Sequence, residues 1–77
     1  MNRIKPNFLL LAKNWPSPFV ARQQIEKFSG GILNSKSMAN LDSLGHGPRG
    51  RFKVGRKVAY PVSAVIAFLE SRCKCSD

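Results

Sequence analysis

The hydrophobic period of this chain changes at a glycine-proline turn at residues 46–48. Before the turn, apolar residues recur every three or four positions, which is typical of amphipathic helices. After it, the segment from Arg51 to Tyr60 alternates polar and apolar side chains, which indicates two paired strands. Helical spacing resumes at Ser63. The pattern therefore predicts a mainly α, small α+β domain of about three helices and a two-stranded hairpin.

The first helix is predicted at residues 21–28. Val20, Ile25 and Phe28 suit one apolar face, and polar residues such as Arg22 take the opposite face. A serine and two glycines end this helix, since glycine readily adopts the left-handed backbone found at helix C-termini.

A second helix is predicted after this glycine pair. Asn34 or Ser35 can cap its first turn by accepting a hydrogen bond from an unpaired backbone N–H, and Gly45 closes it. Its inner stripe consists of apolar residues three positions apart, Met38, Leu41 and Leu44. Two short helices joined by a glycine-containing turn are typical of a helix-turn-helix.

The loop of the predicted hairpin can be placed in two ways. A two-residue loop at residues 55–56 suits the glycine at its first position. A three-residue loop would instead pair Val54 with Val58. It would also pair Phe52 with Tyr60, so that all four apolar side chains share one face. The second register is preferred because it separates apolar from polar side chains.

The last helix is expected to run from Ser63, as its N-cap, to about Arg72, a cation that complements the helix dipole. Its broad apolar face consists of Val65, Ile66, Phe68 and Leu69. We therefore expect most of this helix to be buried beneath the hairpin and the first helix.

The chain is expected to divide into three parts. Residues 1–18 form a leader whose apolar segment makes a short helix or lies across the domain, and Trp15 in this leader is expected to pack on the domain. Residues 19–72 form the folded domain, and residues 73–77 form a frayed tail.

Charge is the first indication of function. The 77 residues include 13 Lys and Arg against 4 Asp and Glu, which gives a net charge of +9. Such a surplus repels itself in a compact chain, and nucleic acid phosphate is the usual compensating partner for a small basic domain. The alternative is a generally basic surface without a dedicated ligand. A chain of this size has too few elements to enclose a large active-site cleft.

Five basic residues crowd the predicted hairpin with no acid among them: Arg49, Arg51, Lys53, Arg56 and Lys57. Strand alternation places Arg51 and Lys53 on its outer face, while Arg56 and Lys57 project from its tip. A basic loop of this kind can lie along a phosphate backbone or enter a minor groove. The alternative is a strand edge whose cations guard it against aggregation.

The start of the second helix carries the polar side chains expected to read DNA: Ser35, Lys36, Ser37 and Asn40. In helix-turn-helix proteins the N-terminal residues of the second helix reach base edges in the major groove. Asn pairs with adenine and Lys donates to guanine. Capping is an equal alternative for Ser35, and a solvated helix face is the alternative for Lys36 and Asn40. Asp42 is expected either to point away from DNA or to pair with an Arg or Lys of the fold.

No catalytic, metal or cofactor site is expected. His46 is the only histidine, and the four acids are spread along the chain without an obvious carboxylate pair. Cys73 and Cys75 are too close for an unstrained disulfide, and no further cysteine pair completes a zinc site. No segment has the length of a membrane span or the pattern of a signal peptide. A cytoplasmic protein with reduced thiols and no small-molecule substrate is expected.

Three features also carry a resemblance to a known family. They are the glycine-proline turn at residues 44–48, the valine-glycine-arginine hairpin with its closing tyrosine at residues 52–60, and a helix that ends in Phe68-Leu69. In these features, residues 19–71 resemble the excisionase and AlpA-type prophage regulators, a MerR-like winged helix-turn-helix family. Asp42 departs from the apolar residue common at its position, and the leader lies outside the family pattern.

The resemblance implies a domain of helices with a two-stranded wing. It also implies binding to direct repeats or promoter sites in double-stranded DNA, with an integrase or another copy of the chain on an adjacent site as further partners. The sequence thus predicts a DNA-binding protein, either an excision factor or a transcription regulator. The main alternative is an adaptor that binds a recombinase or polymerase through the apolar residues 8–11. RNA binding is a weaker alternative, because no aromatic stacking platform is evident.

Overall fold

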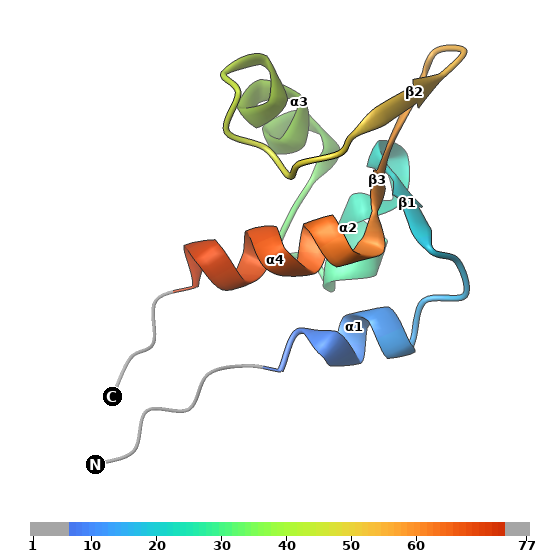
Figure 1. The fold of residues 1–77 in the computed structure, drawn as a ribbon, viewed down its shortest axis with the longest axis vertical. Helices are drawn as coiled ribbons and strands as arrows, with labels where there is room; N and C mark the ends of the chain where they lie inside the picture. Colours follow the sequence, from blue (N-terminus) through green and yellow to red (C-terminus); the bar gives the residue numbers. More distant parts are fainter. Residues whose placement is uncertain (1–6, 74–77) are drawn as a thin grey trace.

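The computed structural model describes residues 7–73, which form a small α+β fold. Its elements in chain order are α1 (Leu9–Lys13), β1 (Phe19–Ala21), the 3₁₀ turn η1 (Arg22–Gln24), α2 (Ile25–Ser29), α3 (Ser35–Ser43), β2 (Phe52–Val54), β3 (Lys57–Pro61) and α4 (Val62–Arg72). The strands make one antiparallel sheet in the order β1-β3-β2. Figure 1 shows α1 and α4 lying side by side at the base, while α3 and the β2–β3 hairpin extend upward from them as two separate arms.

The segment predicted as the first helix begins as a strand. Ala21 belongs to β1, and the helical part is divided between η1 and α2. Val20 pairs with Tyr60 of β3, and both side chains are fully buried. The predicted two-stranded wing is therefore part of a three-stranded sheet. Local periodicity cannot reveal β1, because three residues are too few to establish an alternation, and its partner strand is distant in the sequence. Ile25 and Phe28 are buried, as predicted.

The second predicted helix is confirmed as α3. The backbone N–H of Ser37 donates to Oδ1 of Asn34 at 2.8 Å, which makes Asn34 the N-cap. Met38 is fully buried, but Leu44 is 65% exposed, so the inner stripe ends before the third predicted position. Gly45 has a φ of +77° and ends the helix, as predicted.

The hairpin has the two-residue loop, so the preferred three-residue register was wrong. Val54 pairs with Lys57, and Phe52 pairs with Ala59. Gly55 has a φ of +61°, while Arg56 has a negative φ, which matches a type II′ turn with glycine first. The geometry of the turn sets the register here, because Phe52 and Val54 are not buried in the core and gain little from facing it.

The last helix, α4, begins one residue earlier than predicted and is not capped by Ser63. Its N-cap is Pro61, which makes no side-chain cap hydrogen bond, and Ser63 is an exposed residue of the first turn. The backbone N–H of Val62 donates instead to the carbonyl of Pro18 at 2.8 Å. All four residues predicted for its apolar face are buried, as expected. The helix packs mainly against α1 of the leader and β3 of the hairpin, and not against the first predicted helix.

The described part of the leader packs on the domain. Phe8 is buried in the core, α1 lies against α4, and the Trp15 ring meets the edge of Phe28 at 5.3 Å between centroids. The packing of Trp15 is as predicted. The adaptor surface expected at residues 8–11 is reduced, since only Leu9 and Leu10 are largely exposed. Of the predicted tail, residues 74–77 lie outside the described residues. Between residues 7 and 73, no helix is long and apolar enough to span a bilayer.

Candidate nucleic-acid interface

A buried carboxylate ties the two arms of the molecule together. Oδ2 of Asp42 on α3 accepts a hydrogen bond from Nη2 of Arg22 at 2.6 Å and another from the hydroxyl of Tyr60 at 2.5 Å. Nε of Arg22 donates in turn to the Tyr60 hydroxyl oxygen at 3.0 Å. These three residues come from α3, η1 and β3, so the cluster fixes the position of α3 relative to the sheet. The prediction that Asp42 pairs with an arginine or lysine of the fold is confirmed.

Two members of the cluster, Tyr60 and Arg22, have raised pKa values. Burial raises the pKa of the Tyr60 phenol above its usual value of 10.0, and the hydrogen bond to Asp42 raises it further. The pKa of the Arg22 guanidinium is raised as well, mainly by its hydrogen bond to Tyr60 and to a smaller extent by its hydrogen bond to Asp42. A neutral phenol and a charged guanidinium therefore donate to the same carboxylate at physiological pH.

The loop before β2 passes close to this carboxylate. A Cβ on Gly47 would clash with Oδ1 of Asp42, so a glycine is required where the loop crosses α3. Oδ1 is buried and makes no hydrogen bond with the described residues. Nη1 of Arg51 lies 3.8 Å from it. The glycine-proline turn of the sequence is therefore part of the packing around Asp42.

The sheet presents different side chains to its two sides. Tyr60 points toward α3, and Val58 lies two residues before it on the same face of β3. Lys53 pairs with Val58 and shares that face, while Phe52 and Val54 lie on the opposite face. Arg51 and Lys53 are predicted on the outer face of the hairpin, and this is wrong: Lys53 lies on the face that turns toward α3, and Arg51, just before β2, reaches Asp42 of α3. Phe52 and Val54 face outward instead.

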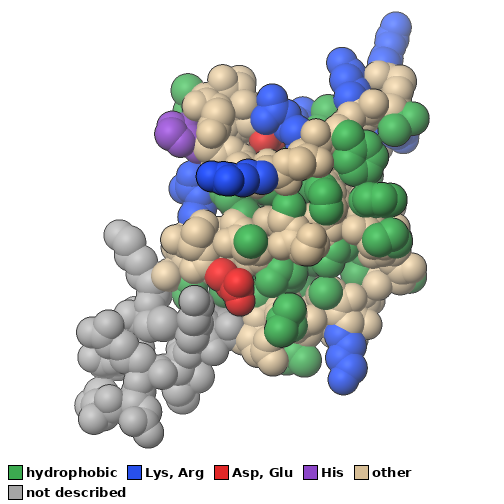
Figure 2. Space-filling view, viewed as in Figure 1, with side chains coloured by type: hydrophobic (Ala, Val, Ile, Leu, Met, Phe, Trp, Pro, Cys, Tyr) green, Lys and Arg blue, Asp and Glu red, His purple; other side chains and the backbone are tan. Residues whose placement is uncertain are grey.

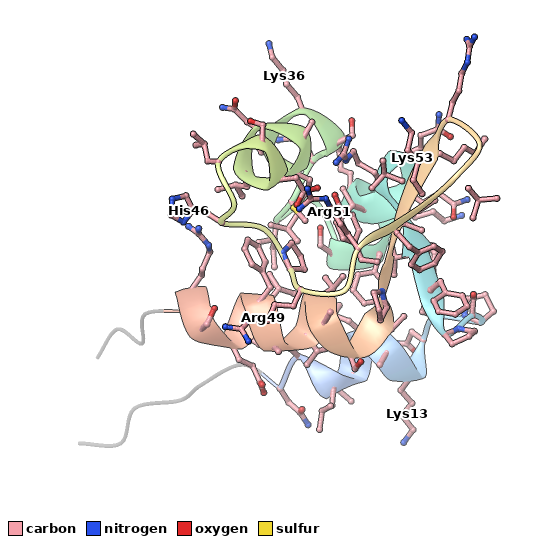
Figure 3. All side chains as sticks on the ribbon, turned by 45° about the horizontal axis from the view of Figure 1, so that its top comes forward. Lys13, Lys36, His46, Arg49, Arg51 and Lys53 are labelled. Atoms are coloured by element: carbon pink, nitrogen blue, oxygen red, sulfur yellow. The ribbon has the colours of Figure 1, made fainter. Side chains whose placement is uncertain are left out.

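The predicted reading residues of α3 are accessible. Ser35, Lys36, Ser37 and Asn40 are all exposed. Because Asn34 supplies the cap, Ser35 is not needed for capping. Figure 3 shows Lys36 on α3 and Lys53 on the hairpin projecting from the same, upper side of the molecule, with Lys13 on the opposite side.

Of the other basic residues predicted for the wing, only some lie on the same side of the molecule as Lys36 and Lys53. Arg56 is exposed in the hairpin loop, and Arg51 lies between the arms with its side chain 48% exposed. Arg49 lies over α4, away from Lys36 and Lys53 (Figure 3). Lys57 lies on the outer face of the sheet, where its Nζ donates to Oε1 of Gln23 at 3.2 Å.

Both arms carry cations without acidic partners in the described part of the chain. Within residues 7–73, Lys36, Lys53 and Arg56 have no carboxylate within 4.0 Å, and the one acid of α3 is buried against Arg22. Figure 2 shows most Lys and Arg side chains of this view in the upper half, over α3 and the hairpin. Arg22 is predicted on the polar face of the first helix, and its role in this cluster is not evident from the sequence. No local signal identifies it, because its partners are 20 and 38 residues away.

Comparisons of the chain with protein-family models, with curated proteins and with solved structures find no match.

Proposed function

We propose that the chain is a sequence-specific double-stranded DNA-binding protein of the winged helix-turn-helix type. The observation that carries this proposal is the common direction of Lys36 on α3 and Lys53 on the hairpin, both exposed and without acidic partners among the described residues. Two basic arms that point the same way provide contacts for two neighbouring parts of a duplex.

In the proposed complex, the first turns of α3 enter the major groove. Asn40 and Lys36 are placed to contact base edges, and Ser35 and Ser37 to contact bases or phosphates. Lys53 and the loop residue Arg56 would contact the adjacent backbone or minor groove. The cluster around Asp42 supports this mode, because it holds the arms at a constant separation before DNA arrives.

The role proposed for this DNA binding is excision or transcription control, in the manner of the excisionase and AlpA-type regulators that the sequence resembles. Such a protein acts by bending DNA or recruiting partners at its site, so the proposal assigns no chemical step to the chain.

Charge reversal in the hairpin tests the proposal. A site is first obtained by selection from random duplex DNA, and its affinity is then measured against salt concentration. We expect log K to fall with log salt by about 0.9 per phosphate contacted. The double variant Lys53→Glu/Arg56→Glu should reduce that slope by about 2. The matched control is Lys13→Glu on the opposite side, which should leave the slope unchanged.

Substitution in α3 tests sequence reading separately. Asn40→Ala should lose about 1–3 kcal/mol of discrimination at one base pair while keeping the salt slope. If selection enriches no sequence, or if Lys13→Glu weakens binding as much as the hairpin variant, the proposed docking mode is wrong.

A further inference from the structure

The outer face of the sheet is apolar and uncovered by the described residues. Phe52 and Ala21 both pair with Ala59, so these three side chains form one row across the sheet. Phe19 and Val54 lie two residues along their strands from this row and therefore share its face. Phe19 is 49% exposed and Val54 is 69% exposed. In the view of Figure 2, apolar side chains gather on the right flank, below the hairpin tip.

This surface, which we call the aromatic face (Phe19, Phe52 and Val54), includes a preformed hollow. The rings of Phe19 and Phe52 meet edge to face at 5.0 Å between centroids, above the small Ala59 side chain of the central strand. The hollow has a volume of ≈ 620 Å³ and extends from these two rings to Trp15. The indole Nε1 of Trp15 donates to the carbonyl of Phe19 at 2.9 Å, which holds this wall in place.

The charges around the aromatic face are positive. Lys27 lines the hollow, and none of its lining residues is acidic. Lys57 pairs with Val54 and so lies on the same face at the other end. If a second copy of the chain docked here, its lysines would face these lysines, and two chains that each carry a net charge of +9 would repel each other. The charge therefore favours an acidic occupant over self-association.

We propose that the aromatic face docks a short acidic segment of a partner protein. An aromatic or leucine side chain of that segment would fill the hollow bordered by Phe19, Phe52 and Trp15, and its carboxylates would pair with Lys27 and Lys57. Aromatic side chains in a pocket commonly supply most of the energy of such an interface, and rim charges mainly set its specificity. The site is independent of DNA binding, because Lys53 lies on the opposite face of the sheet.

The test is selection of random short peptides displayed on phage against the full chain, followed by affinity measurement with the purified peptides. The selected peptides should combine Asp or Glu with Phe, Trp or Leu. Phe19→Ser and Lys27→Glu should each weaken their binding by at least about tenfold. Lys27→Glu changes only an exposed side chain, so it tests the site even if Phe19→Ser impairs folding. Lys13→Glu is the matched charge control and should leave the affinity unchanged.

Two further measurements test whether single-stranded nucleic acid or a second copy of the chain occupies the aromatic face instead. Single-stranded oligonucleotides are titrated against the wild type and Phe19→Ser, and sedimentation gives the oligomeric state of both. The proposal is overturned if no acidic peptide is selected, or if the selected peptides bind Lys27→Glu as tightly as the wild type. It is equally overturned if Phe19→Ser abolishes binding of single strands, or converts a dimer to a monomer, while peptide binding is absent.

Discussion

At the scale of single residues, Asp42 has the greatest structural effect. Its side chain is buried, it accepts from Arg22 and Tyr60, and it belongs to the helix proposed to read DNA. A buried ion pair of this kind contributes little beyond an apolar replacement, but removing one partner leaves the other uncompensated. The function of the cluster is therefore to fix the position of α3 relative to the sheet.

We expect Asp42→Asn to lower the free energy of unfolding by about 3 kcal/mol, because the guanidinium of Arg22 loses its counter-ion. Urea denaturation measures this loss. The matched control is Glu70→Gln, which changes an exposed acid of α4 and should alter stability by less than about 0.5 kcal/mol. Equal effects of the two substitutions would contradict the role given to the cluster.

Tyr60 makes stability depend on pH on the alkaline side. Its pKa in the folded chain is raised above 10.0, so the folded state favours the protonated phenol. The resulting stabilisation is fully present below pH 10 and is lost as the pH rises through the higher folded-state pKa. Because the chain has one tyrosine, ultraviolet absorbance of tyrosinate reports this group alone. In Tyr60→Phe, the alkaline fall in urea midpoint should be shallower than in the wild type.

At the scale of elements, the β2–β3 hairpin depends on the residue that forms its turn, and α3 depends on the residue that caps its N-terminus. The hairpin register follows from Gly55 at a positive φ, and the start of α3 follows from the side chain of Asn34. These signals act within a few residues, so changes there should alter one element without repacking the core.

Gly55→Ala should destabilise the chain by about 1 kcal/mol, because a Cβ is unfavourable in left-handed backbone. Arg56→Ala is the control in the same loop, since its φ is negative and no strain is introduced. Urea denaturation gives the energies, and NMR contacts between Val54 and Lys57 report the register. A stable Gly55→Ala variant with unchanged register would argue against a turn-determined hairpin.

Asn34→Ala should cost about 1 kcal/mol, because the N–H of Ser37 loses its acceptor. Asn34→Asp keeps an acceptor oxygen at the N-terminus of α3 and should retain stability. Hydrogen exchange of the α3 amides distinguishes local fraying from global unfolding. We expect faster exchange in the first turn of α3 for the alanine variant only.

At the scale of the whole molecule, the three-stranded sheet separates two surfaces. One side carries Lys53 and faces α3, and the other carries Phe19 and Phe52. In the two proposed roles, the basic face would contact a nucleic acid and the apolar face a protein, on opposite sides of one sheet.

This separation predicts a pattern of lysine protection. Bound duplex should shield Lys36 and Lys53 from acylation, while Lys13 on the far side continues to react. Mass spectrometry of the modified chain measures each site with and without DNA. Protection of Lys13 equal to that of Lys53 would mean that DNA does not dock between the arms.

Much of the fold is determined by local patterns. The capped start of α3 and its buried Met38, the buried face of α4 around Val65 and Phe68, and the existence of a hairpin all follow from spacing over a few residues. The residues of α3 proposed to read DNA are exposed, as helical periodicity predicts for them.

The remaining features depend on contacts between distant parts of the chain. Strand β1 exists because β3 completes its hydrogen bonds, and Arg22 bonds with Asp42 and Tyr60 because the fold brings these distant residues within reach. The sequence by itself determined the elements with local signals and the surplus of positive charge. Only the tertiary structure decided the strand pairing, the buried cluster and the directions of the basic side chains, because burial and long-range hydrogen bonds outweigh local preference there.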